Sequence, residues 1–313
     1  MRTSETTRTL EAHDSSVIQI EKSAVEPSRN KEADFSIITL GFCFVAFSTK
    51  NRDTLRRTNA LGTGKQRPSV RILKGRAMSD RPLSEVLEEC TERCRNMDAP
   101  LAVRLQTFAQ DVRRLSDEFA DVVERMIARL RTASAGDEAP KPGEPMPEFV
   151  LPDQSGRLIV LSKLIESGPV AIAFHRGHWC PYCRINASAL AGIHTDIRHA
   201  SAELVAITPE MEKFNAELRS TVRAEFPVLS DMDNGYALLL NLAFYVGDEK
   251  QRYMKAAGWD VSPFQGNENW TLPIPATFVV RQNGLIEARF IDPDYRKRMD
   301  VDDLLNAIKS AQL

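Results

Sequence analysis

The chain has few cysteines, no long hydrophobic run and no excess of charge of either sign. Five cysteines among 313 residues are too few, and an odd number, for a secreted disulfide framework. A net charge of −2 gives no electrostatic reason to expect nucleic acid or a membrane surface as a partner. The longest apolar run, residues 36–47, is shorter than the roughly 20 residues that a spanning helix needs. We therefore expect a soluble globular protein in a reducing compartment, the cytoplasm.

Composition divides the chain into four segments. Residues 1–77 are polar, with nine Lys or Arg against one Asp between positions 49 and 77, and we expect them to be a disordered extension. Residues 78–132 show helical periodicity, and residues 133–148 are rich in Pro, Gly and charge, which is typical of a linker. Residues 149–313 read as alternating strands and helices.

Apolar spacing predicts two helices between residues 78 and 132. The apolar face of the first is Leu83, Leu87, Cys90, Cys94 and Met97. The second is expected to be capped by Asp98 and to continue from Leu101 to Met126. Its apolar seam needs a partner, either the first helix or a second copy of the chain, so a homodimer through this arm is one expectation. Because Cys90 and Cys94 lie on an apolar face, we interpret them as core residues.

The remaining segment predicts an α/β fold. We expect a strand and a short turn of helix within residues 156–164. Further strands are expected at 169–175, 203–208, 227–231, 276–281 and 285–291, and helices at 181–199, 210–224, 234–240 and in the last dozen residues. The last two strands form a hairpin at an Asn283–Gly284 turn. Alternating strands and helices followed by a hairpin indicate a mixed central sheet with helices on both faces.

The stretch "AIAFHRGHWCPYCRI" places two cysteines where a strand gives way to a helix. Cys180 is expected at the helix N-cap and Pro181 at the first helical position. The positive end of the helix then favours the Cys180 thiolate, and Arg176 adds to this effect if its side chain turns inward. Cys183 lies one turn into the helix and is expected to be less exposed. Cys180 is therefore predicted to attack and Cys183 to resolve, with a disulfide between them.

A zinc site is the alternative use of this stretch. His175, His178, Cys180 and Cys183 are all zinc-ligand types, but a strand and a helix would have to bring them onto one tetrahedron. We therefore expect no metal, and we interpret the histidines as polar lining of a cleft.

Five stretches occur in a familiar order. They are "FHRGHWCPYC", "AELVAITPE", "FPVLSDMDN", "WTLPIPATFVV" and "NGLIEARFIDPDYRKR". Together they resemble the peroxiredoxin-like proteins of the alkyl hydroperoxide reductase/thiol-specific antioxidant (AhpC/TSA) family, over about residues 143–311. The resemblance implies a thioredoxin fold preceded by a helical arm.

The resemblance also implies an activity, the reduction of hydrogen peroxide or organic hydroperoxides. It assigns the peroxidatic thiolate to Cys180 and the resolving thiol to Cys183, with Arg176 or Arg289 stabilising the departing oxygen. It implies no cofactor, and a thioredoxin or another dithiol as the reductant. The cleft for substrate or redox partner is expected to include His178, Trp179, Tyr182 and Pro275.

Some positions depart from the family pattern and keep other functions open. Gly177 stands where better-known members have Thr or Ser, and Glu287 lies near the place expected for the usual arginine. Cys-Pro-Tyr-Cys is also the motif of glutaredoxins, with Pro275 as the cis-proline that would face the dithiol. The runner-up is therefore a thiol–disulfide oxidoreductase, and a third reading is a redox sensor that signals through helical region 80–132.

The position of the first clean periodicity leads to a prediction about the N-terminus. We expect Met78 to be the natural start of the protein, so an intact-mass measurement on protein from its native source should give the mass of residues 78–313. A native mass that includes residues 1–77 would contradict this.

Overall fold

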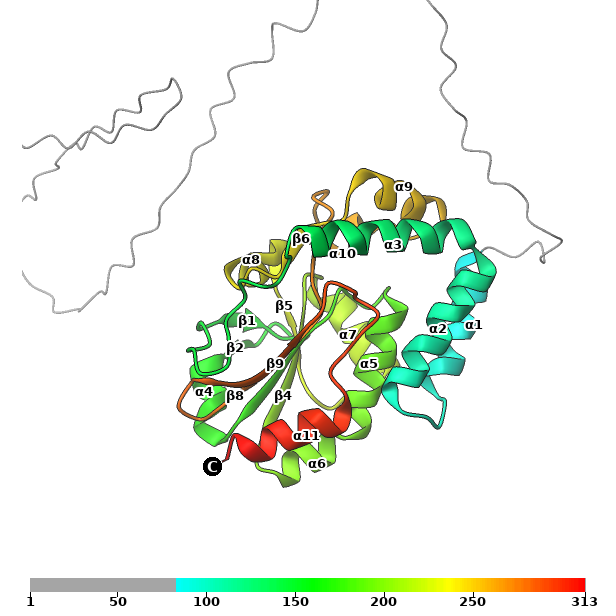
Figure 1. The fold of residues 1–313 in the computed structure, drawn as a ribbon. Helices are drawn as coiled ribbons and strands as arrows, with labels where there is room; N and C mark the ends of the chain where they lie inside the picture. Colours follow the sequence, from blue (N-terminus) through cyan, green and yellow to red (C-terminus); the bar gives the residue numbers. More distant parts are fainter. Residues whose placement is uncertain (1–82, 313) are drawn as a thin grey trace, which may run out of the picture. The chain divides into compact units, whose positions relative to one another are not determined.

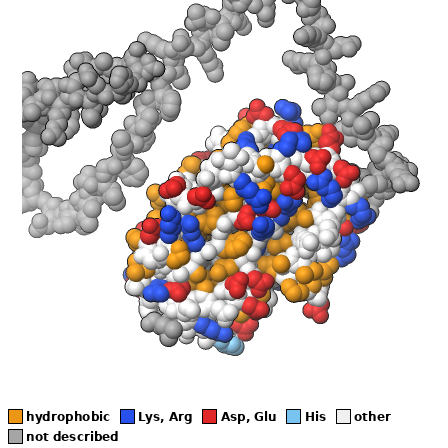
Figure 2. Space-filling view, in the orientation of Figure 1, with side chains coloured by type: hydrophobic (Ala, Val, Ile, Leu, Met, Phe, Trp, Pro, Cys, Tyr) orange, Lys and Arg blue, Asp and Glu red, His pale blue; other side chains and the backbone are white. Residues whose placement is uncertain are grey.

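The structure is a computed structural model that describes residues 83–312. The expected extension at residues 1–77 lies outside the described residues. Within the described range, no helix is both long and apolar enough to cross a membrane. Lys, Arg, Asp and Glu side chains are interspersed over the face in Figure 2, with apolar side chains between them.

A five-stranded mixed sheet lies at the centre of the fold (Figure 1). Its strands, in spatial order, are β5 (Val228–Ser230), β4 (Glu203–Thr208), β3 (Val170–Phe174), β8 (Ala276–Val280) and β9 (Ile286–Ile291). Strands β3, β4 and β5 are parallel, whereas β8 and β9 run antiparallel to their neighbours. Three parallel strands followed by an antiparallel hairpin form a thioredoxin-like sheet, so the predicted fold class is confirmed.

Side chains of the central strand alternate between two hydrophobic clusters. Ile172 and Phe174 belong to a cluster that includes residues of the N-terminal helices, while Ala171 and Ala173 belong to one that includes the C-terminal helix. This alternation is the period of two that a strand imposes. All five residues of β3 are buried, as expected for a strand covered on both faces.

Helices cover both faces of the sheet. Those that follow the sheet strands are α5 (Pro181–Gly192), α6 (His194–His199), α7 (Glu212–Thr221), α8 (Gly235–Leu239) and α11 (Val301–Ser310). The predicted helix at 181–199 is therefore two helices, which meet at Ile193. The others match their predicted positions to within a few residues.

The N-terminal segment forms three helices, not the two predicted. They are α1 (Leu83–Arg95), α2 (Leu101–Leu115) and α3 (Asp117–Thr132). Ser116 ends α2 in an extended conformation and caps α3, because its hydroxyl accepts a hydrogen bond from Phe119 N–H. The proposed Asp98 cap is wrong, because the N-cap is Pro100 and makes no side-chain bond.

The apolar faces of these three helices pack within the chain. Helices α1 and α2 contact each other and α5, and α3 contacts α9 (Asp248–Ala256). Cys90 and Cys94 are 5% and 0% exposed in this core, as the apolar spacing predicted.

The expected linker runs along the sheet edge. The amide of Gly143 donates to the carbonyl of Ile286, and that of Met146 to the carbonyl of Gly284, at 2.8 and 2.9 Å. The segment therefore docks on the β8–β9 hairpin.

Several short elements were not predicted from the sequence. They are strand β1 (Val150–Pro152), hairpin β6 (Ala243–Tyr245) with β7 (Thr271–Pro273), and helices α9 and α10 (Ser262–Gln265). The strand expected within residues 156–164 is β2 (Leu158–Val160), which pairs with β1, and the short turn of helix expected there is α4 (Leu161–Leu164). Between β6 and β7 the chain makes an excursion that carries α9 against α3.

Candidate functional site

The two cysteines lie at the junction of the central strand and α5. Cys180 has the extended N-cap conformation and Pro181 begins the helix, as predicted. Both thiols are free, and both cysteines are 0% exposed. The expectation that Cys180 would be the more exposed of the two is therefore wrong.

The side chain of Arg176 donates a hydrogen bond to the Cys180 sulfur. Nη2 of Arg176 lies 3.1 Å from the Cys180 sulfur. No amide of the helix donates a capping hydrogen bond to the Cys180 side chain. Burial alone would raise the pKa of Cys180, but hydrogen bonding from Cys183 and the charges of Arg176 and Arg298 outweigh burial and hold it well below its ordinary value.

The pKa of Cys183 is shifted in the opposite direction. Burial raises its pKa well above the ordinary value, and its hydrogen bond to the Cys180 sulfur adds to the effect. The backbone N–H of Arg176 donates to the Cys183 sulfur at 3.3 Å, and Arg298 Nη2 lies 3.6 Å from it. These opposite directions favour a thiolate at Cys180 and a thiol at Cys183, which is the pair that an attacking and a resolving cysteine require.

Aromatic rings hold the Arg176 guanidinium against the thiol. Its central carbon lies 3.5 Å from the centre of the Tyr295 ring and 5.3 Å from that of Trp179. Arg176 is only 4% exposed. The negative charge of the Cys180 thiolate, to which Arg176 donates a hydrogen bond, compensates the buried positive charge of the guanidinium.

The structure places Arg289 away from the thiols. Its guanidinium donates to the carbonyl oxygens of Ala139 and Pro140 in the docked segment. Arg298, which the sequence analysis missed, lies beside Cys183 instead. It belongs to the stretch that carried the family resemblance, but no local pattern marks it among three neighbouring basic residues.

The histidines contact other partners than a metal. Nε2 of His175 lies 2.9 Å from Asn186 Oδ1, and burial lowers the pKa of His175 to about 4, which keeps the ring neutral at pH 7. His178 Nδ1 lies 2.8 Å from Glu210 Oε1, and its ring stacks on Phe214. Among the described residues, no three His, Cys, Asp or Glu side chains are grouped to hold a metal ion.

Gly177 is explained by the buried carboxyl group of Glu210. The backbone N–H of His178 donates to Glu210 Oε2 at 2.6 Å, which brings this carboxyl group against the loop. A Cβ atom at position 177 would lie 2.5 Å from Glu210 Cδ, and φ there is +136°. The threonine or serine of the family pattern therefore does not fit at this position.

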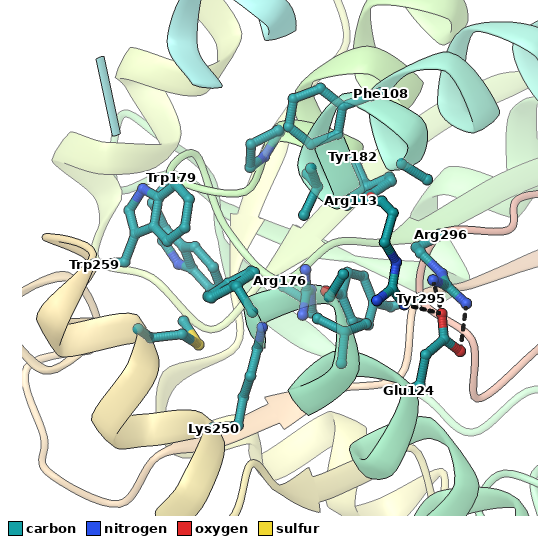
Figure 3. A pocket seen from close by; sticks show the side chains of 17 residues that line it. Phe108, Arg113, Glu124, Arg176, Trp179, Tyr182, Lys250, Trp259, Tyr295 and Arg296 are labelled. Atoms are coloured by element: carbon teal, nitrogen blue, oxygen red, sulfur yellow. Dashed lines mark hydrogen bonds and ion pairs between the residues drawn. The ribbon is translucent and has the colours of Figure 1, made fainter. Parts of the chain in front are cut away.

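A small pocket of about 60 Å³ is lined by Arg176, whose guanidinium contacts the Cys180 sulfur, and by Pro181 and Tyr182 at the start of α5. Figure 3 shows the side chains that line it. Trp179 and Tyr182 line it, as expected, together with Arg176 and Lys250. Its apolar wall is formed by Phe108, Val112, Phe119, Val123, Met254 and Trp259. The Cys180 sulfur does not line the pocket; Arg176 contacts both the sulfur and the pocket.

Two of the expected cleft residues, His178 and Pro275, do not line this pocket. His178 borders a second, polar cleft of about 460 Å³ with Glu88, Glu92 and Arg184, and Trp179 borders both cavities. Pro275 is buried and lines neither of these cavities. The proposal of a cis-proline there is wrong, because no peptide bond within residues 83–312 is cis.

The fold and site define a thioredoxin-like domain with a buried pair of cysteines at a strand–helix junction, one of which favours the thiolate. Comparison with known proteins agrees, because residues 142–289 match the AhpC/TSA family. Over this segment the chain is therefore similar to the peroxiredoxin-like proteins of the AhpC/TSA family.

Individual relatives share part of the chain. A Mycobacterium tuberculosis (strain H37Rv) relative named as a peroxiredoxin is 30% identical over 91 residues, or 29% of this chain and 59% of its own length. Chloroplastic peroxiredoxin Q from Sedum lineare is 25% identical over 168 residues, 54% of this chain and 77% of its own. The crystal structure of peroxidoxin BcpB from Mycobacterium tuberculosis superposes with a TM-score of 0.43 at 20% identity, covering 55% and 97% of the two chains.

The contact between Arg176 and Cys180 predicts the effect of removing the guanidinium. Replacing Arg176 with Met should slow alkylation of Cys180 by iodoacetamide at pH 7 about tenfold or more, because a hydrogen bond to a charged group contributes ~1.5–3 kcal/mol. Arg289→Met is the matched control and should leave the rate unchanged. Equal rates for Arg176→Met and the wild type would show that the thiolate does not depend on this contact.

The crowding at Gly177 predicts a stability difference between two glycines. Gly177→Ala should lower the free energy of unfolding by about 1–3 kcal/mol, because it combines a left-handed φ with a clash against Glu210. Gly192→Ala, at the end of α5 with open space around the new methyl group, should be neutral or stabilising. Urea unfolding measures both. If the two variants are equally stable, the account of Gly177 fails.

Proposed function

We propose that this protein is a thiol-dependent peroxidase that reduces hydrogen peroxide or a small hydroperoxide through Cys180. The supporting observation is the Arg176–Cys180 contact of 3.1 Å, which stabilises a thiolate in a site that water does not reach. The thiolate, not the thiol, is the nucleophile toward a peroxide oxygen.

In the first half-reaction the Cys180 sulfur attacks the terminal oxygen of the peroxide. An S–O bond forms and the O–O bond breaks, so the sulfur becomes a sulfenic acid and the other oxygen leaves as hydroxide or alkoxide, which takes up a proton. Arg176 stabilises negative charge as it moves from sulfur to oxygen.

In the second half-reaction Cys183 resolves the sulfenic acid. Once Cys180 has lost its negative charge, the main charge that opposes ionisation of Cys183 is gone, while Arg298 and the Arg176 amide remain beside the Cys183 sulfur. Cys183 then attacks the Cys180 sulfur, water leaves, and a disulfide forms. A dithiol such as a thioredoxin reduces this disulfide by thiol–disulfide exchange.

The pocket size supports small peroxides as substrates. One water molecule needs at least about 10–15 Å³ of such space, so a pocket of about 60 Å³ holds a molecule of only a few heavy atoms. A protein disulfide is a less suitable first reactant, because Cys180 is 0% exposed. A reductant reaches the sulfurs only after the start of α5 opens, so we expect reduction by the dithiol to be slower than oxidation by peroxide.

A peroxide-consumption assay coupled to thioredoxin and its reductase tests the proposal. Cys180→Ser should abolish turnover, whereas Cys183→Ser should stop after one oxidation and accumulate a Cys180 sulfenic acid that dimedone labels. Cys90→Ala is the matched control, because this buried cysteine lies in the helical core, and it should retain turnover. The same assay should show faster oxidation by hydrogen peroxide than by bulky cumene hydroperoxide.

Two results would overturn the proposal. One is turnover that survives Cys180→Ser. The other is a wild-type thiol that reacts with peroxide no faster than free cysteine while turning over small disulfides, which would favour the thiol–disulfide oxidoreductase.

A further inference from the structure

A buried lysine amine faces the peroxide pocket without a hydrogen-bond partner. Lys250 is 3% exposed, and its Nζ makes no hydrogen bond. Figure 3 shows the side chain extending from α9 toward Arg176. A buried amine without a partner is costly, so its retention in a packed pocket needs an explanation.

Contacts between α3 and α9 hold Lys250 in this position. Lys250 and Met254 are four residues apart, so they share the inward face of α9, and both are buried. On the outside of the two helices, Arg125 of α3 forms an ion pair with Glu249 at 2.7 Å. The Phe119 ring lies 3.5 Å from Lys250 Nζ and favours its charged form.

Two other cations of the pocket already have carboxylate partners. Arg296 pairs with Glu124 at 2.6 Å and with Asp294 at 2.7 Å, and Arg113 pairs with Asp121. Arg176 is directed at the Cys180 sulfur through Nη2, and its buried Nε lacks a partner. Lys250 is therefore the cation of the pocket lining that forms neither a hydrogen bond nor an ion pair.

We infer that Lys250 is a catalytic residue of the proposed peroxidase, which donates a hydrogen bond and then a proton to the oxygen that leaves the peroxide. The inference rests on the proposed function. The loop before Cys180 has no room at Gly177 for a hydroxyl side chain that could donate to a peroxide, and Lys250 brings a donor to the lining of the pocket. Arg176 stabilises the attacking sulfur, and Lys250 protonates the departing oxygen.

The atoms, electrons and proton of this step can all be accounted for. The Cys180 sulfur gains the terminal oxygen and is oxidised by two electrons, and the O–O bond accepts that pair. The departing oxygen takes one proton from the Lys250 ammonium group and leaves as water or an alcohol. The neutral amine regains a proton from solvent when the product leaves.

The charge on Lys250 gives the proposal a pH signature. Burial, together with the charge of Arg176, lowers the pKa of Lys250 well below its ordinary value, while the Cys180 thiolate opposes this. The charged and titratable groups that surround the amine are Arg113, Glu124, Arg176, Cys180, Tyr182, Tyr295 and Arg296. The oxidation rate should rise with pH as Cys180 ionises and fall again as Lys250 loses its proton.

Single-turnover oxidation by hydrogen peroxide and alkylation by iodoacetamide, compared in each variant, test the inference. Iodoacetamide reports only on the thiolate, since its leaving group, iodide, needs no proton. Lys250→Met should lower the ratio of the oxidation rate to the alkylation rate about 10- to 100-fold and should remove the fall in rate at high pH. Added ethylamine should partly restore oxidation in Lys250→Ala.

Lys255→Met is the matched control on the same helix. Lys255 is about half exposed and lies 3.8 Å from Asp260, outside the pocket, so the ratio should not change. Lys250→Met should also unfold at higher urea concentration than the wild type, because it replaces an unpaired buried amine with an apolar chain of similar length.

The outcomes separate the inference from the function on which it rests. An unchanged ratio in Lys250→Met, with the wild type still fast toward peroxide, would overturn the role of Lys250 and leave the peroxidase intact. A parallel loss of oxidation and alkylation would mean that Lys250 only supports the thiolate, which also overturns it. A wild-type rate equal to that of free cysteine would overturn both proposals.

Discussion

The contact between the Arg176 guanidinium and the Cys180 sulfur is the interaction on which the site depends. Both groups are buried, and each supplies the charge that makes burial of the other tolerable. The arginine is held in turn by the Tyr295 ring, which follows the last strand of the sheet. Strand, helix start and C-terminal loop must therefore all be in place before the thiolate is stable.

The sheet brings these parts together, and helices from two parts of the chain surround the pocket next to them. Helices α2 and α3 supply much of its apolar wall, and α9 supplies Met254 and the Lys250 amine. A low-dielectric pocket strengthens each electrostatic contact inside it. The N-terminal helices therefore shape the pocket beside Arg176 as well as packing in the core.

The polar groups around the two thiols differ in which part of the site they contact. Glu210 accepts hydrogen bonds from His178 beside the loop before Cys180, and the space that Glu210 and Trp179 occupy explains the glycine at position 177. Arg298 lies beside Cys183. The two sulfurs thus lie in different electrostatic surroundings although they are one helical turn apart.

The sequence by itself determined the central strands, the strand–helix junction and the place of Cys180 at the start of α5, because periodicity, proline and capping preferences act between neighbouring residues. It did not determine the break at Ser116, the place of Arg298 rather than Arg289 beside the thiols, the trans state of Pro275 or the burial of Lys250 in the pocket lining. Those depend on contacts between distant segments, such as that of Arg298 with Cys183 across 115 positions. Only the packing of α3, α9 and the C-terminal loop around the thiols decided which charges surround them.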